Sequence, residues 1–299
     1  FRLNSLGYLD LRSLGGDCSA NPAVADQILA LQWVRDNIAA FGGDPDSVTL
    51  MGESAGGAAV LTLMTSPPAK GLFHRAIAQS PPIAMIHSRA QSTLWARELV
   101  HRMALPRRSS VEDLRQENYA DLVRSGQSMM WRAGELIHLN SCYAPTVDDE
   151  LIPEHPIAAF ENGHQHQVPL LIGTNSDEAS FGKFLFQRQS SRERAALRLL
   201  ASFDPQHAPE VVAAYDGAVA REDFAHLLAD ALFWAPSTRI ASAHAQAAPT
   251  WMYRFDYASA VLKWLGLGAM HSMELGNVFG DPYSCLLYTS PSPRDKRQS

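Results

Sequence analysis

Residues 52–56, with the sequence GESAG, decide the fold of this 299-residue chain. They follow the β-rich run VTLM at 48–51 and precede the small-residue run GAAV at 57–60. This order is typical of a nucleophile elbow, a sharp strand-to-helix turn whose central serine has strained backbone angles. Such a turn needs small neighbours, and the glycines at the two ends of the pentapeptide provide them. The pattern predicts that Ser54 is a nucleophile lifted clear of a sheet.

The residues after Ser54 are expected to begin a helix. Free N–H groups and the positive end of the dipole at a helix N-terminus would then face a developing oxyanion. The first such donor would be the backbone N–H of Ala55. A Gly-x-Ser-x-Gly match also arises by chance in a chain rich in Ala and Gly, so the wider pattern must support the motif.

The elements around the motif predict an α/β fold. Asn21 and Pro22 open a helix with one apolar face, the breakers at 41–45 end it, and a strand follows at once. Helix, loop, strand and elbow in this order favour a mostly parallel sheet with helices on both faces. Long helical stretches between residues 80 and 168 and between 181 and 250 would form insertions over the site. Strands are predicted at 48–51, 76–78, 168–172 and 250–255, and further helices at 92–103, 192–201, 209–220 and 236–247.

The composition of the chain limits the classes of binding partner that we expect. Hydrophobic residues make up 46% of the chain and charged residues 19%, and no apolar run reaches the ~18 residues of a membrane span. The net charge of −6 offers no basic surface for a phosphate backbone. We therefore expect a small-molecule substrate, neutral or cationic, and neither nucleic acid nor a membrane span.

Metal-binding patterns are weak in this sequence. Cys18, Cys142 and Cys285 are odd in number and far apart, which is unlike a disulfide framework or a zinc site. His164 and His166 lie close together without carboxylate or cysteine neighbours, so a solvated loop is the favoured interpretation. We assign no metal and no cofactor.

A serine nucleophile at neutral pH needs a histidine base and an acid that orients it. Asp177 and Glu178 follow the apolar strand that ends at Ile172, and loops at the carboxyl ends of parallel strands form sites. Either carboxylate could serve as the acid. A solvated acidic loop or a helix cap would explain the pair equally well.

Eleven histidines compete for the role of base. His271 lies in the Gly-rich segment 266–274, after the predicted strand 250–255, and so completes the order serine, acid, histidine. A single histidine in a loop is more often structural, and position alone does not assign it.

The spaced motifs together resemble the type-B carboxylesterases, a family that includes bacterial para-nitrobenzyl esterases and cholinesterases. Residues 41–56 are similar to the family's serine signature, and residues 26–38 to the helix before it. Residues 173–181 resemble its acid loop, and residues 271–280 its histidine loop. The resemblance runs from residue 1 to about residue 280.

This resemblance implies an α/β-hydrolase fold that cleaves carboxylic esters through an acyl-enzyme, without a cofactor. It assigns Ser54, Glu178 and His271 as the catalytic triad. Glu53, Ser80 and Glu274 would form a buried polar network behind the site. Two departures stand out: the family's Gly after the acid is Ala179, and its His-Gly-Gly-Gly loop, which supplies further oxyanion donors, does not occur in the sequence.

The missing loop leads to an expectation about organisation. We expect residues 1–284 to be an incomplete α/β-hydrolase domain without its first strands, keeping only Ala55 in the oxyanion hole. Residues 285–299 are polar and rich in Pro, Lys and Arg, which predicts a disordered or non-native tail. Two alternatives remain: a catalytically silent cholinesterase-like binding module, and an inactive truncated fragment.

Overall fold

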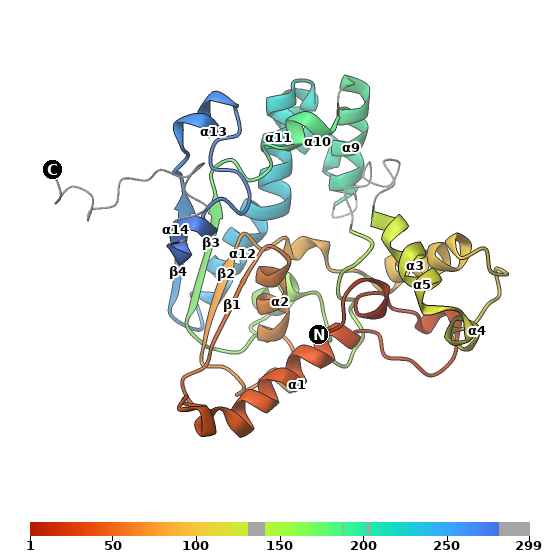
Figure 1. Cartoon of the computed structure of the whole chain (residues 1–299). Helices are drawn as coiled ribbons and strands as arrows, with labels where there is room; N and C mark the ends of the chain where they lie inside the picture. The colour runs from red at the N-terminus through yellow and green to blue at the C-terminus, as the bar shows by residue number, and fades with distance from the viewer. Residues whose placement is uncertain (131–140, 187, 202–203, 281–299) are drawn as a thin grey trace.

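A parallel four-stranded sheet forms the centre of the molecule (Figure 1). The structure, a computed structural model, describes residues 1–130, 141–186, 188–201 and 204–280. The strands lie in the order in which they occur along the chain, and all four overlap the predicted runs. They are β1 (Thr49–Glu53), β2 (Arg75–Gln79), β3 (Leu170–Asn175) and β4 (Thr250–Phe255).

The main hydrophobic core packs against one face of the sheet. Helix α2 (Ala55–Met64) packs on β1 and β2, and α12 (Ala235–His244) packs on β3 and β4. Apolar residues of α1 (Pro22–Asn37) join the same cluster. Burying these side chains is the main favourable term in folding, at roughly 25 cal/mol per Å² of apolar surface. The strand residues in this core include Ala76, Ala78, Leu170 and Ile172.

The opposite face of the sheet carries an apolar row. Met51, Ile77, Leu171 and Trp251 stand in register across the four strands. Met51, Leu171 and Trp251 are 39%, 36% and 57% exposed. Helices α2 and α12 both pack on the core face, and this parallel sheet with packed helices confirms the predicted α/β fold class.

The first insertion, between β2 and β3, contains α3 (Arg89–Arg102) on the predicted segment 92–103. A capping box at Ser88 and Gln91 fixes its start, because each side chain bonds the other residue's backbone N–H. The other helices in the described part of this insertion are α4 (Val111–Gln116), α5 (Tyr119–Met130), α7 (Pro156–Glu161) and the short turn η5 (Ile83–Met85).

The second insertion, between β3 and β4, has a core of its own that includes Phe224 and Leu199. The helix predicted at 209–220 ends early, at Ala214, because the backbone leaves the helical path at Tyr215 and has positive φ at Asp216 (48°) and Gly217 (70°). The elements before α12 are α8 (Gly182–Leu185), α9 (Gln189–Ala201), α10 (Ala208–Ala214), η6 (Asp216–Ala218), α11 (Arg221–Ala229) and η7 (Asp230–Trp234).

Short elements complete the described ranges. No helix in those ranges is both long enough and apolar enough to cross a bilayer. The predicted boundary between residues 284 and 285, and the tail after it, lie outside the described residues. The remaining elements are η1 (Asn4–Leu6), η2 (Arg12–Leu14), η3 (Ile38–Phe41), η4 (Pro67–Ala69), α13 (Ala260–Trp264) and α14 (Leu275–Phe279).

Candidate active site

Ser54 stands at the turn between β1 and α2 with φ 55° and ψ −121°, a conformation that L-residues rarely adopt. The turn is tight because a Cβ on Gly52 would lie 2.3 Å from the backbone of Gly56. A Cβ on Gly57 would lie 2.8 Å from the carbonyl oxygen of Gln79. A Cβ on Gly56 would meet nothing within 4 Å. The steric demand for glycine therefore falls on positions 52 and 57, whereas the sequence analysis expected it at 52 and 56.

Backbone hydrogen bonds fix the strand ends beside this turn. The N–H of Ser54 donates to the carbonyl of Gln79 on the neighbouring strand at 2.8 Å. The N–H of Ser80 donates in the same way to Gly173 at 2.8 Å, and that of Ser176 to Phe255 at 2.9 Å. The carboxyl ends of all four strands are thus joined into one edge. Ala55 begins α2, where the first N–H groups have no helical acceptor.

His271 connects the hydroxyl to the acid. Its Nε2 lies 2.7 Å from Oγ of Ser54, and its Nδ1 lies 2.6 Å from Oε2 of Glu178. The imidazole is 17% exposed and the Glu178 side chain only 1%. The structure therefore brings together three side chains that are far apart in the sequence, with 217 positions between Ser54 and His271. Their order, hydroxyl to imidazole to buried carboxylate, is that of a catalytic triad.

The two adjacent carboxylates have different partners. Oε1 of Glu178 accepts the backbone N–H of Asn175 at 2.7 Å, which leaves Oε2 for the imidazole. Oδ2 of Asp177 accepts the backbone N–H of Ala269 at 3.0 Å, in the loop that carries His271. The geometry thus favours Glu178 as the residue that orients the imidazole, while Asp177 fastens the histidine loop.

The imidazole lies in a negative environment. Burial lowers the pKa of His271, but the hydrogen bond to Glu178 and the charges of Glu178, Glu53 and Glu274 outweigh it and raise the pKa above its ordinary value. An imidazolium is therefore stabilised here, which is what a base needs after it has taken a proton.

The other predicted residues lie behind the triad. Glu274 is 1% exposed, and its carboxylate accepts the amide of Asn175 at 2.6 Å and that of Gln79 at 3.5 Å. Burial, together with the charges of Glu53 and Glu178, raises the pKa of Glu274 despite the bond from Asn175. Ser80 is fully buried with φ 47°, and its hydroxyl has no hydrogen-bond partner among the described residues.

The residues considered for a metal have local partners. Nδ1 of His164 contacts the carboxylate of Glu154, and the imidazole of His166 bonds the carbonyl of Ser66 at 2.8 Å. The described ranges contain no cluster of three His, Cys, Asp or Glu suited to an ion. Cys18 is a free thiol, and Cys285 lies outside the described residues.

Comparison with known proteins identifies the family. A model of the carboxylesterase family matches residues 1–295. The chain belongs to the carboxylesterase family. The para-nitrobenzyl esterase of Bacillus subtilis (strain 168) is 36% identical over 285 residues, covering 94% of this chain and 56% of the relative. The phenmedipham hydrolase of Pseudarthrobacter oxydans is 32% identical, covering 94% and 55%. The chain thus spans about half the length of the curated relatives it matches.

Solved structures confirm the α/β-hydrolase fold. A thermophilic PNB esterase superposes with a TM-score of 0.84 at 32% identity, covering 99% of this chain and 60% of its own. A second PNB esterase superposes with a TM-score of 0.81 at 31% identity over the same shares. The fold predicted from the elbow and its flanking elements is therefore correct for this chain.

Two contacts of this candidate site were not predicted from the sequence. The ring of Phe233 lies against the imidazole of His271, with centroids 4.7 Å apart and planes at 40°. Phe233 belongs to η7, a π-helical turn, and such turns are frequent at functional sites. The hydroxyl of Ser272 donates to Oε1 of Glu53 at 2.6 Å. The only sequence signal for Ser272 is that it directly follows the histidine.

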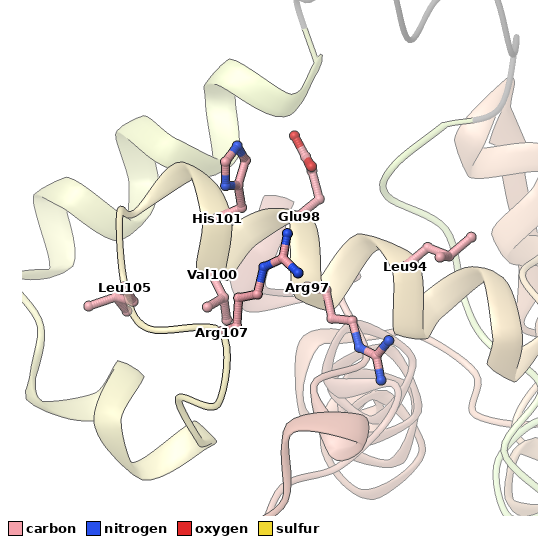
Figure 2. Close-up of a pocket in the computed structure, with 7 residues that line it drawn as sticks. All are labelled: Leu94, Arg97, Glu98, Val100, His101, Leu105 and Arg107. Carbon is pink, nitrogen blue, oxygen red and sulfur yellow. The ribbon is translucent and has the colours of Figure 1, made fainter.

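Surface hollows lie beside and away from this site. A hollow of about 240 Å³ adjoins Glu178 and is also lined by Asp230, Trp234 and Arg254. Another, of about 530 Å³, lies along α3 and contains none of the predicted site residues (Figure 2). Its lining residues are Leu94, Arg97, Glu98, Val100, His101, Leu105 and Arg107.

Proposed function

We propose that the protein hydrolyses carboxylic esters through an acyl-enzyme on Ser54. One observation carries the proposal: a single imidazole, that of His271, is within hydrogen-bond distance of both the elbow hydroxyl and a buried carboxylate. Nucleophile, base and orienting acid in contact are the requirements of this chemistry. Membership of the carboxylesterase family supports the same reaction.

Acylation uses the proton acceptor at Nε2. As Oγ of Ser54 attacks the carbonyl carbon, its proton passes to Nε2 of His271, and the carbonyl oxygen becomes an oxyanion near the N–H of Ala55. Glu178 accepts the Nδ1–H and stabilises the imidazolium. The tetrahedral species then loses its alkoxy group, which takes the proton from Nε2 and leaves as the alcohol.

Deacylation repeats these steps with water. The water oxygen attacks the acyl carbon while one of its protons passes to Nε2 of His271. The bond between the acyl carbon and Oγ of Ser54 then breaks, Oγ regains a proton from Nε2, and the carboxylic acid is released. In this scheme Glu53 and Glu274 act on His271 through their charges, whereas the predicted place of Ser80 in the same polar network remains a prediction.

The proposed substrate is a small-molecule carboxylic ester. The relatives are named para-nitrobenzyl esterase and phenmedipham hydrolase, and the first name supports an ester with an aromatic group. No further cofactor is required, because the proposed proton transfers use only the residues of the triad.

Labelling with a fluorophosphonate probe and turnover of a short-chain aryl ester test the function. Ser54→Ala should abolish labelling and reduce turnover to near background, because the probe reacts with the activated hydroxyl. Ser190→Ala, at an exposed serine of α9, is the matched control and should label normally. A folded protein that binds esters but neither labels nor turns them over would favour the silent binding module instead.

A further inference from the structure

Two pairs of consecutive residues face each other across the site. Glu53 ends β1 and Ser54 follows it at the turn, and His271 and Ser272 lie in the histidine loop. Ser54 contacts His271 at 2.7 Å, and Ser272 contacts Glu53 at 2.6 Å, so each residue of one pair has a partner in the other. A third close approach runs diagonally: Nε2 of His271 lies 3.4 Å from Oε1 of Glu53.

The diagonal approach creates a competition for one proton. Nε2 of His271 must give its proton to the leaving alkoxy group, which occupies the neighbourhood of Oγ of Ser54. Oε1 of Glu53 is an anionic acceptor for the same N–H, and charge-assisted bonds are stronger than those to neutral oxygens. An Nε2–H turned toward Glu53 would be withheld from the reaction.

Ser272 is placed to settle this competition. Its O–H donates to the same oxygen, Oε1, that approaches the imidazole. A carboxylate oxygen that already accepts a short hydrogen bond attracts a second donor less strongly. We infer that Ser272 is a positioning residue, whose hydroxyl holds Oε1 of Glu53 and keeps that carboxylate from capturing the Nε2–H of protonated His271. The inference rests on the proposed ester hydrolysis for its catalytic meaning.

The backbone at this position supports a role for the side chain. Ser272 has φ 68°, in the left-handed region where glycine is favoured and a serine costs free energy. The same backbone turn carries the hydroxyl to Glu53. A glycine would satisfy the turn and lose this contact.

Three carboxylates face the imidazole and contribute to the His271 pKa that the experiment measures. Glu178 approaches from the loop after β3, Glu53 from the end of β1, and Glu274 from the start of α14. The ring packed on the imidazole from η7 is the uncharged Phe233. Changing Ser272 alters none of these charges, so an effect on the His271 pKa must act through one of them.

The experiment is an NMR titration of the His271 imidazole in the full chain, assigned with His271→Gln. Ser272→Gly should raise the His271 pKa by about half to one pH unit, because Glu53 loses a donor and attracts the imidazolium more strongly. The acid limb of fluorophosphonate labelling should move up by the same amount. Ser272→Asn, which tolerates the left-handed turn and carries an N–H donor, should return the pKa toward the parent value.

A double-mutant cycle separates positioning from a structural effect. In a Glu53→Gln background the carboxylate charge is gone, so Ser272→Gly should leave the His271 pKa unchanged. An equal pKa change in both backgrounds, or no rise in the first, overturns the inference. If the parent chain does not label at all, the proposed hydrolysis fails, while the titration still decides the role of Ser272.

Discussion

His271 is bound to Glu178 twice. Its imidazole Nδ1 lies 2.6 Å from Oε2 of the carboxylate, and its backbone N–H donates to the Glu178 carbonyl at 3.2 Å. The side-chain contact orients the ring, and the backbone contact docks the loop. A mutation of the Glu178 side chain can therefore change the orientation of the imidazole while the backbone bond still holds the loop.

Glu178→Gln should leave the loop docked and the reaction slow. The backbone bond to His271 survives the change, but an amide no longer compensates the imidazolium charge and favours the wrong tautomer. We expect acylation to slow by ~10⁴, as for the equivalent change in other triads. Stopped-flow acylation and thermal unfolding of the variant measure the two effects. A decrease of less than tenfold would remove Glu178 from the triad.

The pH dependence follows from the sign of the His271 shift. Burial lowers the His271 pKa, but the bond to Glu178 and the nearby carboxylates raise it above 6.5 overall. Because the base must be neutral, the acid limb of labelling should lie above pH 6.5. A group with a raised folded-state pKa stabilises the fold fully below its unfolded pKa, and this stability is lost as pH rises through the folded pKa. Labelling rates across pH 5–9 measure the acid limb, and urea unfolding over the same range measures the pH dependence of stability. An acid limb of labelling below pH 6.5 would contradict the raised His271 pKa.

Gly268→Ala should displace the histidine loop. Gly268 has φ +59°, and a Cβ there would lie 2.3 Å from Oδ2 of Asp177, the oxygen that fastens Ala269. Gly266→Ala is the matched control, since φ is +69° but its Cβ would meet nothing within 4 Å. Both should lose ~1–2 kcal/mol to backbone strain. Only Gly268→Ala should also slow labelling of Ser54, and equal labelling in the two variants would contradict the steric argument.

The glycines of the elbow should differ in stability. Gly52→Ala places a methyl group 2.3 Å from the backbone of Gly56, an overpacking that should cost at least ~1–3 kcal/mol. Gly56→Ala has open space in α2 and should stabilise the protein by up to ~1 kcal/mol, because alanine favours helix. Denaturant unfolding of both variants measures the difference. Similar losses in the two would show that the turn does not have this shape.

Local pattern was enough to predict much of this molecule. The runs that became β1 to β4 are apolar and bounded by breakers, and the elbow and His271 occupy positions that parallel-strand topology brings to one edge. Residue pattern alone left Asp177 and Glu178 as equals, because adjacent carboxylates differ only in the direction that the backbone gives them, and it was the family resemblance that assigned Glu178.

The contacts that escaped prediction depend on geometry that sequence does not encode locally. Phe233 reaches His271 through a π-helical turn, and apolar periodicity at 3.6 residues gives no sign of the extra residue. Ser272 and Glu53 are 219 positions apart and meet only once the strand ends are aligned. Pairing over such a distance is a property of the assembled sheet.

The interstrand bonds from the serines at the strand ends have an evolutionary consequence. The backbone N–H of each serine, Ser54, Ser80 and Ser176, donates to the strand beside it. The adjacent strands, and not the connecting segments, therefore fix the position of the edge that carries the reacting side chains. Connectors such as the two helical insertions are therefore free to lengthen, shorten or be exchanged while the edge keeps its alignment. The range of substrates can therefore change through these connectors while the reacting side chains keep their positions.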